Sequence, residues 1–222
     1  MVIIGLSDIH GDLSKINKIA ASVSASDLIL LVGDITHFGK EEEAGTILGV
    51  IKNLNPHILA VSGNCDFPQV AYYLEHEGIS IHRSGRLING IGFIGVGGSL
   101  TTPFNTPNEM SEKDLSSCLD EAISNLQPDI PFILISHQPP FNTCCDRIHS
   151  GEHVGSQSLR TFIEKHQPLI CFTGHIHESI GIDTIGKTKI INPGQFSLKG
   201  YAVAELDMDS DDPVQELSVQ TV

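Results

Sequence analysis

The stretch that decides the fold is VIIGLSDIHG, residues 2–11. Its first part, Val2–Leu6, is apolar, and the polar segment 7–11 follows it directly. A short, continuous apolar run is typical of a parallel strand that is buried on both faces. The polar residues after it stand at the carboxyl end of the strand, where open α/β sheets place their functional sites.

The same pattern recurs twice in the next fifty residues. Leu28–Val32 and Ile58–Val61 are apolar runs of strand length, and each ends in a glycine-containing polar segment. Between the runs, apolar residues repeat at helical spacing, from Leu13 to Val23 and from Ala44 to Ile51. The sequence therefore predicts a βαβαβ beginning with parallel strands.

The rest of the chain predicts a mixed or antiparallel end. Ile79–Ile81 and Ile91–Val96 read as the two strands of a β-hairpin, and Ser111 with Asp114 forms a capping box at the start of a helix. Further elements are expected as strands at Phe132–Ile135 and Leu169–Phe172, a short helix around 159–163, and short strands from Ser179 onward.

Composition narrows the class of protein. The chain has 222 residues, 40% of them apolar and 18% charged, which excludes disorder and favours one globular domain over residues 1–222. No apolar run approaches the roughly 18 to 20 residues of a membrane span, and neither a span nor a secretory signal is expected.

Charge and cysteine content bear on partners and location. Asp and Glu number 27 against 13 Lys and Arg, a formal charge of −14, which argues against a nucleic-acid polymer or an anionic membrane as partner. The five cysteines are scattered and show no C-x-x-C spacing, so a cytoplasmic location is expected. Assembly into a homo-oligomer stays open.

Polar clusters follow five of the predicted strands and supply metal ligands. Because the carboxyl ends of parallel strands meet at one edge of a sheet, we expect these clusters to converge. Two carboxylates, one amide and four imidazoles suit Mn, Fe, Zn, Ni or Co better than calcium, and Mn is favoured. The predicted ligands are Asp8, His10, Asp34, Asn64, His137, His175 and His177.

Seven ligands exceed the need of one ion. With Asp34 as a bridge, the set divides into two four-ligand sites: Asp8, His10, Asp34 and His177; and Asp34, Asn64, His137 and His175. A hydroxide held between two such ions has a pKa near 7 and is a nucleophile at neutral pH. The two cations, two carboxylates and hydroxide leave about one net positive charge, which suits an anionic substrate.

These motifs, D-x-H-G, G-D, G-N-x-D, a strand-end His and G-H-x-H, together resemble the calcineurin-like metallophosphoesterases. The resemblance spans Asp8 to His177 and includes all seven ligands. It implies a four-layer αββα sandwich of two facing mixed sheets flanked by helices, and a two-metal centre that hydrolyses phosphate esters. It also implies in-line attack by the bridging hydroxide, which Asn64, His137 and Asp66 are expected to support.

Two departures from the family pattern refine the expected activity. Many relatives have His after the G-N pair to protonate the leaving oxygen; this chain has Cys65, and G-N-C-D resembles a small bacterial and archaeal phosphodiesterase branch. In phosphoprotein phosphatases an Arg follows the aspartate of the G-D motif, whereas no Arg follows Asp34 in this chain. These departures favour a monoanionic diester, such as a small organic or nucleotide phosphodiester. The alternatives are a phosphomonoesterase with the same centre and a non-catalytic protein-binding scaffold of this fold.

The remaining site residues are expected in loops. The segments 98–110 and 138–156 are long, and long loops in compact domains often carry function, so substrate specificity is expected to reside there. His37, His149 and His153 lie in loops that reach the rim of the site, and we assign them to its surroundings or to solvent, not to catalysis.

Overall fold

The computed structural model describes residues 1–222, and the chain from Val2 to Val61 forms the predicted βαβαβ unit. β1 (Val2–Leu6), β2 (Leu28–Val32) and β3 (Ile58–Val61) pair in parallel. They are joined by α1 (Ile16–Ala25) and α2 (Glu41–Leu54). Almost every strand residue is buried, because helices cover one face of this sheet and a second sheet covers the other.

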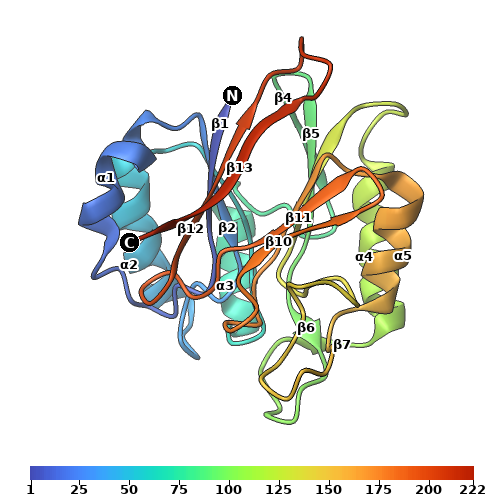
Figure 1. Ribbon diagram of the computed structural model, residues 1–222. Coiled ribbons are helices and arrows are strands. Elements are labelled where there is room, and N and C mark those ends of the chain that lie inside the picture. Colours follow the sequence, from blue (N-terminus) through green and yellow to red (C-terminus); the bar gives the residue numbers. More distant parts are fainter.

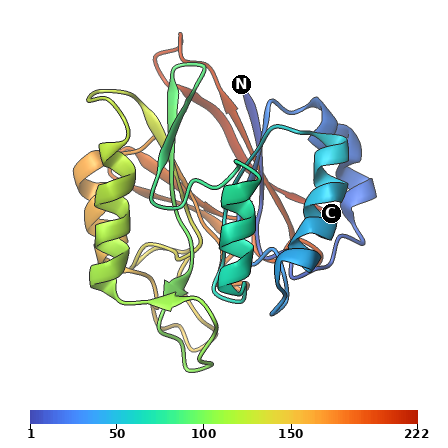
Figure 2. The same ribbon diagram turned by 180° about the vertical axis from the view of Figure 1, so that it is seen from behind.

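Two antiparallel strands from the end of the chain complete the first sheet. β12 (Gly200–Leu206) pairs with β1, and β13 (Val214–Thr221) pairs with β12, which gives the order β13-β12-β1-β2-β3. α3 (Pro68–His76) joins α1 and α2 on the outer face, where apolar side chains of the three helices form one buried cluster with the sheet. Figure 2 shows these helices together on one flank.

The second sheet is also mixed, with the order β10-β11-β9-β8-β5-β4. Its outer face is covered by α4 (Glu112–Ser124) and α5 (Gln157–His166). The predicted capping box of α4 is confirmed, since Ser111 Oγ accepts from Asp114 N at 3.2 Å. The strands are β4 (Gly85–Ile88), β5 (Ile91–Val96), β8 (Phe132–Ser136), β9 (Ile170–Phe172), β10 (Gly181–Ile185) and β11 (Thr188–Asn192).

The two sheets face each other, and the expected αββα sandwich is confirmed (Figure 1). Side chains from both inner faces form one buried cluster, with Leu30 and Val61 on one side and Phe93 and Ile133 on the other. Contact is close enough to require glycine at Gly5, where an added Cβ would lie 2.9 Å from the Phe172 ring. None of the helices is both long and apolar enough to cross a membrane.

The predicted hairpin at residues 79–97 is wrong in its first strand. The hairpin is β4–β5, and its turn is Asn89-Gly90, with φ of 50° and 80°, a pair that suits tight hairpin turns. β4 is mostly solvent-facing and so has no apolar run to reveal it. Ile79–Ile81 is apolar for another reason: it is buried beside β3, where Ser80 bridges to Ala60.

Candidate metal centre

The polar clusters predicted from the sequence meet at one end of the two sheets. β1, β2, β3, β8 and β9 all end there, at the lower end in Figure 1, where the long loops around β6 (Ser99–Leu100) and β7 (Glu109–Met110) also lie. The loops that leave these strands bring the seven predicted ligands together: Asp8, His10, Asp34, Asn64, His137, His175 and His177.

One group of donors forms around Asp8. His177 Nε2 lies 3.1 Å from Asp8 Oδ1 and 3.1 Å from His10 Nε2. His10 Nε2 in turn lies 3.7 Å from Asp34 Oδ2. These are the four residues that the sequence assigns to the first ion.

A second group forms around His137. Its Nε2 lies 3.0 Å from Asn64 Oδ1 and 3.5 Å from Asp34 Oδ1. The ring of His175 is beside it, with 5.2 Å between the ring centroids. Asp34 therefore lies between the two groups, with Oδ2 toward His10 and Oδ1 toward His137, as a bridging ligand requires.

The donor atoms around His137 fit a cation. His137 Nδ1 lies 2.8 Å from the carbonyl oxygen of Val32, which can only accept, so Nδ1 carries a proton and Nε2 is the nitrogen that a cation would bind in exchange for the second proton. Nε2, the Asn64 oxygen and the Asp34 carboxylate then bring lone pairs together in a buried space. Burial lowers the pKa of His137, but the carboxylates of Asp34 and Asp8 raise it to about 9. The field that retains a proton here also favours a metal ion.

The backbone of the site is strained. Asp8, His10, Asp34 and His175 have φ values of 53°, 48°, 47° and 66°, in the left-handed region that side chains other than glycine avoid. Each such residue costs about 1–3 kcal/mol and persists where the surrounding structure enforces it, typically at ligand sites. Four of the seven predicted ligands are held in this way.

Asp66 lies behind the predicted ligands and joins two loops of the site. Its fully buried carboxylate does not line the cavity beside the ligands; it accepts from the backbone N of Thr36 at 2.8 Å, Gly63 at 2.8 Å and Ile35 at 3.2 Å. Burial, together with the charge of Asp34, raises the pKa of Asp66 to about 6. Asp66 thus ties the loop after β2 to the loop after β3, and through these bonds it supports the position of Asp34.

Cys65 lies at the cavity wall, and its backbone binds Asp34, the residue predicted to bridge the two metal ions. Its N–H donates to Asp34 Oδ1 at 2.8 Å, and its side chain is among the cavity-lining groups. Burial and the nearby Asp34 carboxylate raise the pKa of the thiol far above its ordinary value. In the metal-free protein the side chain is therefore a neutral thiol, which is a weak hydrogen-bond donor.

The three loop histidines take different places. The His37 ring makes an edge contact with His10 at 5.4 Å between centroids, and His149 lines the cavity with Nδ1 2.7 Å from Glu178 Oε1. His153 does not line the cavity. Its Nδ1 lies 2.6 Å from Asp146 Oδ1, so it belongs to the internal structure of the 138–156 loop.

Sequence reasoning missed two residues that orient Asn64. Asn64 Nδ2 donates to Thr106 Oγ1 at 3.1 Å, and Thr106 Oγ1 donates to Glu109 Oε1 at 2.6 Å. Burial raises the pKa of Glu109, but hydrogen bonds from Thr106 and Thr102 lower it to about 2, so the carboxylate only accepts. The Thr106 hydroxyl proton is thus committed to Glu109, and its oxygen accepts from the Asn64 amide. The Asn64 oxygen is left facing His137.

Asn192 does more than form a turn beside the site. Its buried side chain donates to the carbonyl oxygen of Ile176 at 2.9 Å and accepts from Gly194 N at 2.8 Å. This amide therefore fixes the loop that carries His175 and His177. The sequence offers only a weak signal for these residues: Thr106 and Glu109 lie in a long loop, and Asn192 lies in a turn-forming segment.

Thr106→Val tests the orientation of Asn64. Valine keeps the shape of threonine but cannot accept from the amide, so we expect the affinity of one of the two metal sites to fall about tenfold, as is usual when the partner of a metal ligand is lost. Isothermal titration of the metal-free protein with Mn²⁺ measures this. Thr101→Val, in the same loop, is the matched control. Identical titrations of Thr106→Val and wild type would contradict the assignment.

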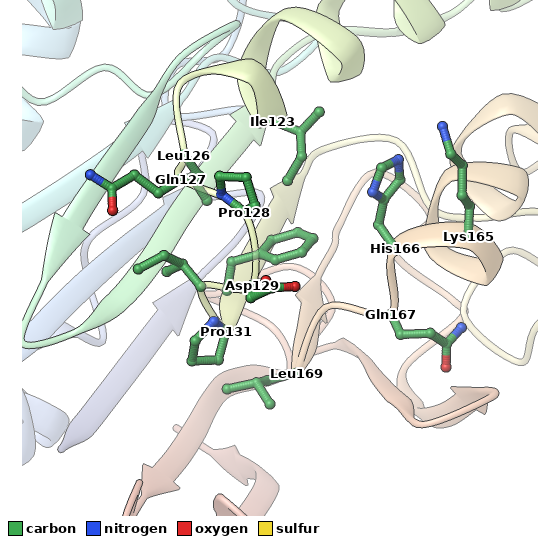
Figure 3. A pocket seen from close by; sticks show the side chains of 12 residues that line it. Ile123, Leu126, Gln127, Pro128, Asp129, Pro131, Lys165, His166, Gln167 and Leu169 are labelled. Carbon is green, nitrogen blue, oxygen red and sulfur yellow. The ribbon is translucent and has the colours of Figure 1, made fainter.

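A cavity of about 740 Å³ opens beside the candidate metal centre. It is lined by five of the predicted ligands, by the loops at 100–106 and 148–154, and by Phe38. A second hollow, of about 570 Å³, lies between the ends of α4 and α5, and Figure 3 shows Pro128, Pro131 and His166 around it. None of the predicted ligands lines the second hollow, so the first is the candidate active site.

Comparison with known proteins agrees with this geometry. The sequence model of the calcineurin-like phosphoesterase family matches residues 1–179. An uncharacterized protein of Methanocaldococcus jannaschii is 40% identical over 207 residues, which are 91% of each protein. A crystal structure of a Thermus thermophilus protein is similar in fold, with a TM-score of 0.74 and 21% identity over 99% of this chain and 98% of that one. Purple acid phosphatase PPD1 from yellow lupin seeds gives a TM-score of 0.60 and 13% identity, over 92% of this chain and 49% of its own.

Proposed function

Because the chain belongs to the calcineurin-like phosphoesterase family, we propose that it is a dinuclear metal-dependent phosphodiesterase that hydrolyses small phosphodiesters. The proposal of two metal ions rests on the position of Asp34, whose two carboxylate oxygens face two separate groups of donors. The observation that carries the diester part is the charge of the cavity wall, which contains no Lys or Arg.

The roles of the residues follow from this arrangement. Two divalent ions would supply Lewis acidity toward the phosphate and would activate a water molecule as the nucleophile. Asp8, His10 and His177 would hold one ion, Asn64, His137 and His175 the other, and Asp34 both. In hydrolysis the water oxygen bonds to phosphorus, the ester P–O bond breaks, and the alcohol leaves with a proton. The Cys65 thiol is a weak donor for that proton, so esters of acidic alcohols are the better substrates.

The absence of cationic side chains favours a diester over a monoester. A phosphate monoester is a dianion at neutral pH, and enzymes that bind it surround its oxygens with Arg, Lys or equivalent positive charge. Here the cavity wall offers the carboxylates of Asp34 and Glu178, the imidazoles of four histidines, and no guanidinium or ammonium group, so most of the positive charge would come from the ions. About one net positive charge matches the monoanion of a diester.

The test is a comparison of bis(p-nitrophenyl) phosphate with p-nitrophenyl phosphate, which share one chromogenic leaving group. With Mn²⁺ added to metal-free protein, we expect kcat/KM for the diester to exceed that for the monoester by about tenfold or more, since the extra charge is uncompensated. Equal or greater monoester turnover would make the protein a phosphomonoesterase. If neither compound is hydrolysed with Mn, Fe, Zn, Ni or Co, the protein is instead a non-catalytic scaffold of this fold.

A further inference from the structure

The cavity beside the metal centre has more apolar wall than a phosphate group requires. Its volume of about 740 Å³ is in the range of sites that enclose a whole organic ligand. Besides the metal ligands, its lining includes Phe38, Leu100, Pro103 and Phe104. These side chains cannot contact phosphate oxygens favourably, so they are available to the organic part of an ester.

Two aromatic rings of this wall are exposed to solvent. Phe104 is 81% exposed and Phe38 is 47% exposed, although phenylalanine is ordinarily among the most buried residues. Exposed apolar surface beside a cavity is typical of a ligand-binding site. Both rings lie where a molecule bound at the metal centre would extend.

Backbone conformation and hydrogen bonds define the loops that carry both rings. Phe38 has a φ of 57°, a strained value for a bulky residue, and its ring makes an edge contact with His37 at 5.0 Å between centroids. Phe104 N donates to Thr102 Oγ1 at 3.1 Å, and Thr102 Oγ1 donates to Glu109 Oε1 at 2.7 Å. Glu109 is the carboxylate that also anchors Thr106. The rings are thus presented on fixed loops, which reduces the entropy cost of binding.

We propose that Phe38 and Phe104 bind a flat aromatic group of the substrate, so that the protein selects phosphodiesters that carry an aryl ring or a nucleobase. This inference rests on the proposed function, since the phosphate of the same molecule would sit at the metal centre. With no Lys or Arg in the wall, aromatic and apolar contact gives the cavity a means to distinguish one diester from another.

Binding of two phosphinates to Mn²⁺-loaded protein tests the inference without catalysis. Diphenylphosphinate and dimethylphosphinate carry the same monoanionic head group and no ester bond. By isothermal titration we expect diphenylphosphinate to bind about tenfold more tightly, and we expect Phe104→Ala and Phe38→Ala each to reduce that ratio about threefold or more. Tyr72→Ala is the matched control, since Tyr72 is 70% exposed but does not line the cavity.

The outcomes separate this inference from the proposed function. Equal binding of the two phosphinates, or a ratio that Phe104→Ala and Phe38→Ala leave at the wild-type value, would overturn the aromatic site even if diesters are hydrolysed. If the ratio of the two phosphinate affinities follows the prediction but the protein hydrolyses no ester, the aromatic site is retained and the proposed phosphodiesterase activity is overturned.

A second arm distinguishes the aryl ring from the nucleobase. Methyl, phenyl and thymidine 5′ esters of p-nitrophenyl phosphate release the same phenol, so their KM values report the other substituent. A lowest KM for the phenyl ester assigns an aryl ring, and a lowest KM for the thymidine ester assigns a nucleobase. KM values for both that are no lower than that of the methyl ester would contradict the proposal.

Discussion

Replacing Asp34 with Asn is expected to reduce metal-dependent diester turnover by about 10³-fold or more and to lower the metal content from two ions to one or none per chain. The change keeps the shape of the side chain but removes the negative charge and one of the two oxygens that face His10 and His137. Metal analysis of dialysed protein and kcat/KM on bis(p-nitrophenyl) phosphate measure both effects.

Asp129→Asn is the matched control for this experiment. Asp129 also has a left-handed backbone, with φ of 65°, but it lies at the hollow between α4 and α5 (Figure 3). It should keep full metal content and turnover.

Removal of His177 should weaken one metal-binding step and removal of Asn64 the other. Full turnover with two ions in Asp34→Asn would contradict the bridging role.

Replacing Cys65 with His is expected to raise the turnover of diesters with poor leaving groups by about 10²-fold, the lower end of what general acid catalysis contributes. The neutral thiol at this position is a weak donor, whereas an imidazolium protonates a departing alkoxide. Cys65 lines the cavity beside His10 and Asp34, so an imidazole at this position is placed next to the candidate metal centre. Diesters of p-nitrophenol, whose leaving group is stable without a proton, should be hydrolysed at similar rates by both proteins.

The measurement is log kcat against leaving-group pKa for a series of aryl methyl phosphates, with metal content determined for each protein. The plot should be shallower for Cys65→His than for wild type. Cys65→Ala, which separates loss of the thiol from gain of the imidazole, should follow the wild-type slope within about tenfold in rate. Loss of turnover in Cys65→Ala with two ions still bound would show that the thiol itself takes part in the reaction.

The parts of the fold that the sequence predicts correctly are those with a local cause. β1, β2 and β3 are short runs of buried apolar residues, so their period and length identify them, and the polar residues that follow them necessarily meet at one edge. The start of α4 is also local, since Ser111 and Asp114 cap it within one turn. The first strand of the hairpin fails because β4 is solvent-facing, while Ile79 and Ile81 are apolar for packing against other elements.

The surroundings of the site depend on contacts between distant segments and are beyond local patterns. The orientation of Asn64 is set by Thr106, 42 residues away, and the burial of Asp66 is set by the loop after β2. His153 lies in a loop that reaches the rim, yet it pairs with Asp146 because that loop folds on itself. Each of these assignments requires the path of a loop, which residue types and spacing do not determine.

Anomalous diffraction from crystals of the Mn²⁺-loaded protein tests the central claim most directly. The account predicts two anomalous peaks per chain, about 3.5–4 Å apart, with the Asp34 carboxylate between them, Asp8, His10 and His177 at one peak and Asn64, His137 and His175 at the other. A single peak in fully loaded crystals, or two peaks of which one has no contact with Asp34, would contradict it.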